Sequence, residues 1–296
     1  MDLKYILDQI DPRLSDKDLK QKQKVIASLR KKYADYKDPW GFDLDLIEQL
    51  LTIALPLYRK YFKVRVFGLE NVKDTPYILC SNHTGQIPID GFLLTIAMAY
   101  EFPNNPRVIH GMVERFLAGF PFLGSLAARS GSILGDRENC KWLLEKGESI
   151  SVFPEGVRGI SKSTPDYYKL QTFSNGFFRI ALQTKTPILP ISIIGAEEMF
   201  PFVYHAKPLA KALGIPALPL SANLIPLPSP VDIYIGKPYQ LPKDLSFETA
   251  TNEEIRKHIY KIEKQIKANI NIGLKSRRKW MGLLPSMKTK IENKHG

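Results

Sequence analysis

The stretch YILCSNHTGQIPID, residues 77–90, decides how the fold is interpreted. Its first four residues form a short apolar run that is typical of a buried strand. A loop with His83 follows, and Pro88 suits the first turn of a helix, which we expect over Ile89–Tyr100. Strand, loop and helix in this order form the repeating unit of an α/β sheet. The stretch therefore predicts that His83 lies at the carboxyl end of a strand, where such sheets assemble active sites.

The same alternation continues on both sides of this stretch, so the sequence predicts an α/β fold with a mixed, mostly parallel sheet flanked by helices. Two further helices are expected over residues 137–146 and 175–184. Apolar runs that predict further strands lie at 64–68, 107–110, 132–134, 149–153, 188–195 and 231–236.

The chain divides into three parts. Residues 1–62 are expected to form an N-terminal helical region that can associate with a membrane. Within it, a basic helix over 17–36 precedes an apolar helix over 43–61, which Pro56 kinks. Residues 63–240 hold the α/β domain, and residues 241–296 hold a C-terminal helix and a basic tail. The thin apolar stripe of the basic helix fits either a solvated surface helix or a helix that rests on anionic headgroups.

Two segments carry little regular pattern. Residues 207–230 form an apolar insertion with six prolines, which excludes one long helix or a central strand. The insertion is either an ordered cover over the core or a surface that contacts membrane or acyl chain. Residues 274–290 mix basic side chains with Trp280 and leucines, which suits an anionic interface or a disordered end.

Composition narrows the class of protein. The 296 residues include 42 Lys and Arg against 30 Asp and Glu, and the net charge of +12 favours an anionic partner. Cys80 and Cys140 form no disulfide framework and indicate a reducing compartment. The charged N-terminus differs from a signal peptide, and no apolar run reaches the about 18–20 residues of a spanning helix. The histidines are scattered along the sequence, so we expect no metal site. The aromatic residues are not interleaved with the basic stretches, so we expect no nucleic-acid partner.

His83 and Asp90 are the candidate catalytic pair, because a carboxylate can orient a histidine that acts as a general base. Gly85 and Pro88 oppose a continuous helix between them, so the loop must bring the two side chains together. Two further segments carry an arginine just beyond a predicted strand. In Phe153–Arg158, either Arg158 binds a phosphate or Glu155 and Arg158 pair within a turn. In Gly131–Arg137, either Arg137 binds a phosphate or it is a surface residue.

Together these segments resemble the motif series of the phospholipid/glycerol acyltransferase family, which includes the lysophosphatidic acid acyltransferases. The resemblance covers about residues 60–240, in the family's order. Six residues separate His83 from Asp90 where the family usually has four, as in a divergent branch. The matching segments are Asn82-His83 with Asp90, Gly131–Arg137, Phe153–Arg158 and the Pro-rich Thr186–Pro190.

The resemblance implies that residues 63–240 form an acyltransferase domain. It implies transfer of a fatty acyl group from an acyl thioester, acyl-CoA or acyl-ACP, to a glycerolipid hydroxyl, foremost that of 1-acylglycerol-3-phosphate or another lysophospholipid. No bound cofactor is expected, since the thioester is a co-substrate. The expected location is the cytoplasmic face of an anionic membrane, peripheral or monotopic. By the same resemblance His83 is the base, Asp90 orients it, Glu155, Gly156 and Arg158 hold the acceptor, and Arg137 adds a cation for its phosphate.

Two alternatives remain open. One is acylation of a neutral acceptor such as diacylglycerol or a fatty alcohol, which would not require Arg137 and Arg158. The other is a non-catalytic basic protein that binds membranes.

Overall fold

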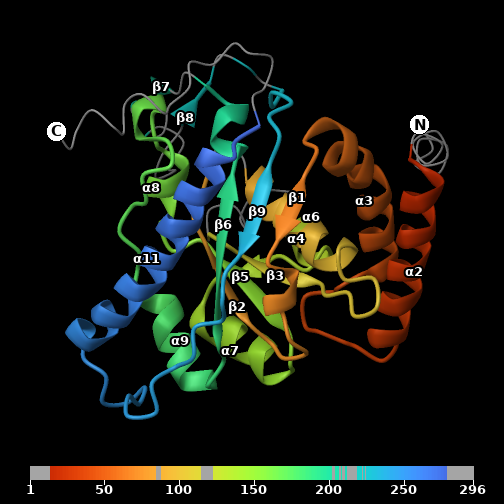
Figure 1. Cartoon of the computed structure of the whole chain (residues 1–296). Helices are drawn as coiled ribbons and strands as arrows, with labels where there is room; N and C mark the ends of the chain where they lie inside the picture. Colours follow the sequence, from red (N-terminus) through yellow and green to blue (C-terminus); the bar gives the residue numbers. More distant parts are fainter. Residues whose placement is uncertain are drawn as a thin grey trace.

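The apolar run at residues 77–80 belongs to strand β2 (Ile78–Ser81), which is the middle strand of the sheet (Figure 1). The structure is a computed structural model that describes residues 14–84, 88–114, 123–201 and 225–278, and also 204–206, 208, 211, 219–221 and 223. Over these residues the sheet has seven strands in the order β1-β9-β6-β2-β5-β3-β4. The other strands are β1 (Arg65–Phe67), β3 (Ile109–Val113), β4 (Ile133–Leu134), β5 (Ser149–Val152), β6 (Ile188–Ile194) and β9 (Asp232–Ile235).

The directions of the strands confirm a mixed, mostly parallel sheet. Strands β2, β3, β4, β5 and β6 run parallel to one another, so their carboxyl ends lie along one edge. Strand β9 is antiparallel to β6 and parallel to β1. A separate pair, β7 (Tyr204–His205) and β8 (Pro219–Leu220), is antiparallel.

Alternation along the central strands gives the sheet two buried faces. In β2, Leu79 packs into one hydrophobic cluster while Ile78 and Cys80 pack into the other. Helices α2 (Asp16–Lys32), α3 (Leu44–Pro56) and α4 (Ile89–Tyr100) supply the first cluster. Helices α7 (Arg137–Glu145), α9 (Gly176–Thr184) and α11 (Asn252–Lys275) supply the second (Figure 1). Both faces of the sheet are thus covered, as the alternating pattern predicts.

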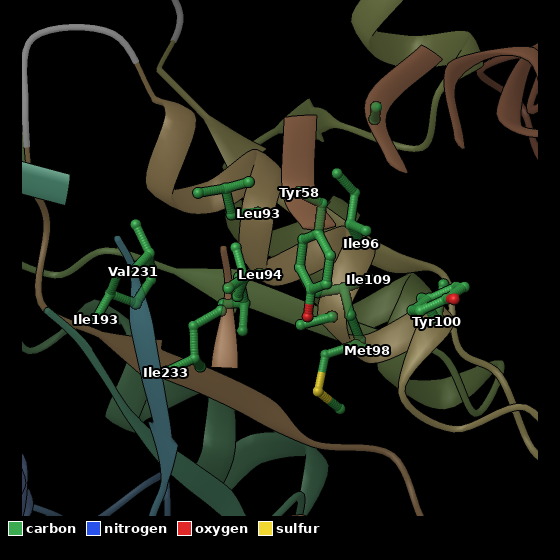
Figure 2. Close-up of a cluster of buried hydrophobic side chains, with 14 of the residues drawn as sticks. Tyr58, Leu93, Leu94, Ile96, Met98, Tyr100, Ile109, Ile193, Val231 and Ile233 are labelled. Atoms are coloured by element: carbon green, nitrogen blue, oxygen red, sulfur yellow. The ribbon is translucent and has the colours of Figure 1, made fainter. Parts of the chain in front are cut away.

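The first cluster fixes helix α4 against the sheet. Figure 2 shows Leu93 and Leu94 of α4 beside Ile193 of β6 and Ile233 of β9. All four side chains are buried. Burial of side chains of this size stabilises by about 1.5–3 kcal/mol each. This packing sets the position of the first turn of α4, which carries Asp90.

The N-terminal helices are present, with two differences from the predicted bounds. Helix α2 ends at Lys32, because Tyr33 turns into the core. Beyond Pro56 the chain continues as a π-helical turn, Leu57–Tyr61, in which the N–H of Phe62 donates to the carbonyl oxygen of Leu57. The apolar residues of α2, including Val25 and Leu29, face the protein core.

Five segments differ from the sequence prediction or lie wholly or partly outside the described residues. Strand β3 begins at Ile109, two residues late, and the backbone N–H of Arg107 donates to the carbonyl oxygen of Met98 at the end of α4. Helix α6 (Leu123–Arg129) and the short helix α8 (Val157–Ile160) were not predicted. Half of the residues of the Pro-rich insertion at 207–230, and the tail beyond residue 278, lie outside the described residues.

Candidate active site

The candidate site lies where β2 ends between its two neighbours. Residues after β2 carry His83, residues after β5 carry Glu155, and residues after β6 carry Glu197. Because β6, β2 and β5 are adjacent and parallel, these three segments meet at one edge of the sheet. The order of the strands therefore brings together side chains that are far apart in the sequence.

His83 and Asp90 form a direct pair. Nδ1 of His83 lies 2.7 Å from Oδ2 of Asp90, and Asp90 is fully buried. The same oxygen accepts from the N–H of Thr84 at 2.8 Å and from its hydroxyl at 3.3 Å. A carboxylate oxygen only accepts, so the ring proton of a neutral His83 resides on Nδ1 and Nε2 keeps its lone pair. The side chain of His83 is 14% exposed.

The start of helix α4 explains how Asp90 reaches His83 although six residues lie between them in the sequence. Helix α4 begins at Ile89, immediately after Pro88, so Asp90 lies in its first turn. Its other oxygen, Oδ1, accepts from the N–H of Gly91 at 2.7 Å. The carboxylate is thus held from both sides and directed back at the loop that carries His83.

Packing fixes the position of His83. The imidazole stacks on the ring of Phe153, with centroids 4.4 Å apart and an interplanar angle of 30°. Gly159 also lies close to His83, since a Cβ added to it would stand 2.6 Å from Cβ of His83. Only glycine fits at this position without displacing the histidine. The sequence offered one sign of this, a glycine four residues after Glu155.

Asn82 extends the sheet by one residue through its side chain. Its Oδ1 accepts from the N–H of Ile193 at 2.8 Å, and its Nδ2 donates to the carbonyl oxygen of Ile193 at 3.0 Å. Asn82 is fully buried. The side chain therefore satisfies two backbone groups of β6 and anchors the residue before His83, a role that the sequence did not reveal.

Glu155 points inward and is 1% exposed. Oε1 accepts from the backbone N–H of His83 at 2.8 Å, and Oε2 accepts from the N–H of Gln171 at 2.8 Å. The buried ammonium of Lys162 lies 3.4 Å from Oε2. Both oxygens are thus engaged by the protein, so Glu155 positions His83 in this structure.

Gly156 is half-buried and Arg158 is exposed in the same loop. Gly156 has φ of 57° and ψ of −147°, a conformation that requires glycine. The side chain of Glu114 approaches it, with Oε1 3.9 Å from where a Cβ at 156 would stand. Arg158 is exposed, and its guanidinium donates to the carbonyl oxygen of Thr172 at 2.8 Å. Arg158 does not pair with Glu155, so the alternative of a Glu–Arg turn is wrong.

Arg137 lies elsewhere. Its Nε donates to Gln183 at 3.0 Å, and its guanidinium lies 4.3 Å from the ring centroid of Phe247. Gln183 is near the carboxyl end of α9, roughly 10 Å along the helix from the end that adjoins Phe153–Arg158. Strand β4, which precedes Arg137, is three positions from β2, about 14 Å across the sheet. The structure thus groups the other predicted residues and separates Arg137 from them.

Two charged residues near His83 were missed by the sequence analysis. Lys162 and Glu197 are both buried, and Nζ of Lys162 donates to Oε1 of Glu197 at 2.7 Å. Nothing in the local sequence distinguishes this lysine from a surface lysine.

In the described part of the chain, no helix is long and apolar enough to cross a membrane, and no cluster of three or more His, Cys, Asp or Glu could hold a metal ion.

The fold and this site define an α/β protein with a carboxylate-oriented histidine at the carboxyl edge of a parallel sheet. Residues 63–194 match the model of the family described as Acyltransferase. That part of the chain belongs to the acyltransferase family, as the motif series predicted.

Similar proteins agree with this membership. An uncharacterized protein of Mycobacterium tuberculosis (strain H37Rv) is 35% identical over 216 residues, which cover 69% of this chain and 60% of that protein. The matched part thus spans less than two thirds of that relative. A chloroplastic 1-acyl-sn-glycerol-3-phosphate acyltransferase of Brassica napus is 31% identical over 157 residues, covering 51% of this chain and 42% of that protein.

A solved structure shares the fold. The crystal structure of the 1-acyl-sn-glycerophosphate acyltransferase PlsC from Thermotoga maritima superposes with a TM-score of 0.53. The match covers 89% of this chain and 98% of that chain, at 20% sequence identity. The likeness confirms the α/β architecture with its N-terminal helices.

Proposed function

We propose that this protein is an O-acyltransferase that moves a fatty acyl group from an acyl thioester, acyl-CoA or acyl-ACP, to a hydroxyl of a glycerolipid. The observation that carries the proposal is the contact of 2.7 Å between Nδ1 of His83 and Oδ2 of Asp90, on a chain segment of the acyltransferase family. The foremost acceptor is 1-acylglycerol-3-phosphate or another lysophospholipid.

In the proposed reaction His83 is the general base. Its Nε2 takes the proton of the acceptor hydroxyl as that oxygen attacks the thioester carbonyl carbon. The carbon–sulfur bond then breaks, and the imidazolium returns the proton to the leaving thiolate. Asp90 stabilises the imidazolium and keeps the ring in the required tautomer. Base catalysis of this kind contributes about 10²–10⁴-fold.

A covalent enzyme intermediate is not part of the proposal. The hydroxyl nearest to His83 in the sequence is that of Thr84, which is buried and donates to Asp90. It therefore serves the carboxylate and is poorly placed to attack. A thiolate is in any case a good leaving group, so a direct transfer suffices.

The acceptor assignment rests on the exposed charge of Arg158, in the loop that also carries Glu155. Arg158 is exposed beside Gly156, and a guanidinium binds phosphate bidentately. Arg158, without Arg137, is the proposed phosphate partner. The name of the Brassica napus relative supports a phosphate-bearing acceptor. Binding at an anionic membrane surface follows from the net charge of +12 and from the exposed lysines of α2, whose apolar residues face inward.

The test is incubation of the purified protein with labelled acyl-CoA or acyl-ACP and a panel of acceptors, which includes lysophosphatidic acid, monoacylglycerol and diacylglycerol. We expect acylation of lysophosphatidic acid, lost in His83→Ala and lowered about 10²–10⁴-fold in Asp90→Asn. Equal transfer by His83→Ala would exclude the proposed base. No transfer to any acceptor would instead favour a non-catalytic membrane-binding protein.

A second comparison tests the phosphate partner. Arg158→Gln should raise KM for lysophosphatidic acid and leave KM for the acyl donor unchanged. Lys141→Gln is the matched control, because it removes the same charge from a side chain of helix α7 that is 36% exposed. Equal rates on lysophosphatidic acid and monoacylglycerol would exclude a phosphate-bearing acceptor and favour a neutral one.

A further inference from the structure

Lys162 is a buried cation beneath the loop that carries His83. Its side chain is 3% exposed, and a buried ammonium is costly unless it is paired. Nζ donates to Oε1 of Glu197 at 2.7 Å and lies 3.4 Å from Oε2 of Glu155. The side chains of both carboxylates are at most 1% exposed. The three side chains thus form one buried cluster of two carboxyl groups and one ammonium.

The cluster joins the two strands that flank β2. Glu155 follows β5, and Glu197 lies in the 3₁₀-helix η5 (Ala196–Met199) that follows β6. Strand β2 lies between β5 and β6, and the loop with His83 extends from its end. The ammonium of Lys162 therefore ties together the chain on both sides of the histidine.

The carboxylates of Glu155 and Glu197 make the ammonium of Lys162 necessary at this position. Burial alone lowers the pKa of Lys162, but Glu197 and Glu155 outweigh burial, so the pKa of Lys162 lies above its usual value. Burial, with a smaller contribution from Glu155, raises the pKa of Glu197 to about 7, although Lys162 acts in the opposite direction. Without the ammonium, the two carboxylates would repel each other in a buried site.

Only Glu155 lies between Lys162 and the main chain of the proposed base. Glu155 accepts directly from the backbone N–H of His83 at 2.8 Å. A displacement of Glu155 would therefore displace the main chain of the base. Misplacement of a catalytic group by about 1 Å costs about 10²-fold in rate.

We propose that Lys162 is a positioning residue for His83, which acts by holding Glu155 in place and is itself held by Glu197. The proposal rests on the proposed function, in that His83 is the base whose position matters. Lys162 touches no reacting atom, so it should affect the rate of the chemical step and leave substrate binding unchanged.

The experiment compares Lys162→Met with Lys162→Arg in the full chain. Lys162→Met keeps the length of the side chain and removes its charge, and it should lower kcat about 10–100-fold with both KM values within about twofold of the wild type. Lys162→Arg keeps the charge and should recover part of kcat. Lys169→Met is the matched control, because Lys169 lies in the same segment with its side chain 65% exposed. It should behave as the wild type.

A second measurement needs no activity. In protein labelled with ¹⁵N-histidine, which has five histidines, the backbone amide signal of His83 should shift in Lys162→Met and stay in place in Lys169→Met. If Lys162→Met does not fold, the double variant with Glu197→Gln removes one of the two repelling carboxylates and serves in its place.

The outcomes separate the two proposals. Wild-type kcat and an unmoved His83 signal in a folded Lys162 variant would overturn the positioning role while His83→Ala still tests the base. An inactive wild type would overturn the proposed function, and the His83 signal would still report whether Lys162 sets the position of the loop.

Discussion

The backbone N–H of His83 donates to Oε1 of Glu155 across 2.8 Å, so a buried carboxylate holds the main chain of the proposed base. The two residues are 72 positions apart in the sequence and meet because β2 and β5 are adjacent. The other oxygen of Glu155 is engaged by the N–H of Gln171. The glutamate of the Phe153–Arg158 segment therefore supports the base from within the protein.

Glu155→Gln tests this role. One oxygen would become an NH₂ group that faces a donor, either the N–H of His83 or that of Gln171. Two buried donors that face each other without an acceptor cost about 1–3 kcal/mol. We expect kcat to fall about 10–100-fold with KM for the acceptor nearly unchanged. Steady-state kinetics with varied acceptor measures both quantities. A rise in KM alone would show that Glu155 binds the acceptor, as the sequence resemblance implied.

Gly159→Ala tests the packing against His83. The new Cβ would stand 2.6 Å from Cβ of His83 and 2.9 Å from Cβ of Glu155, and neither atom belongs to a flexible side-chain end. We expect loss of most activity and a lower melting temperature, because overpacking costs about 1–3 kcal/mol. Gly176→Ala is the control, since nothing lies within 4 Å of its added Cβ. Wild-type activity in Gly159→Ala would contradict the described contact.

Asn82→Ala tests the anchor of the catalytic loop. The N–H and carbonyl oxygen of Ile193 would both lose their partner in a fully buried place. We expect the free energy of unfolding to fall by about 2–4 kcal/mol, measured by urea unfolding at constant m-value. Asn82→Asp should also destabilise, because a carboxylate cannot donate to the carbonyl oxygen. A change below about 0.5 kcal/mol would contradict the anchoring role.

The fold and the centre of the site could be predicted because their signals are local. Strand, loop and helix follow one another over residues 77–90, and that succession also fixes where His83 and Asp90 meet. The alternation of apolar runs likewise indicated a sheet covered on both faces, as Leu79 and Cys80 confirm by packing on opposite sides.

The remaining features depend on the order of strands in the sheet, which the sequence does not state. Arg137 follows a strand just as Arg158 does, but its strand is at the edge of the sheet. Glu155 points inward because the N–H of His83, brought from 72 positions away, and two further donors surround it, and Lys162 is buried because carboxylates that follow two different strands surround it. A residue type at a strand end predicts proximity to the active edge, but its partners follow only from the tertiary structure.

Glu197→Gln tests the buried charge cluster through its pH dependence. The pKa of Glu197 is about 7 in the folded protein, against a usual value of 4.5. Between these values the folded protein binds more protons than the unfolded chain, so the stability that Glu197 contributes is present below pH 4.5 and is lost as pH rises towards 7. The loss is on the order of 3 kcal/mol. We expect urea unfolding from pH 4.5 to 8 to show this decline in the wild type and in Glu248→Gln, an exposed control, and to show it removed in Glu197→Gln. A parallel decline in all three proteins would mean that Glu197 does not titrate in this range.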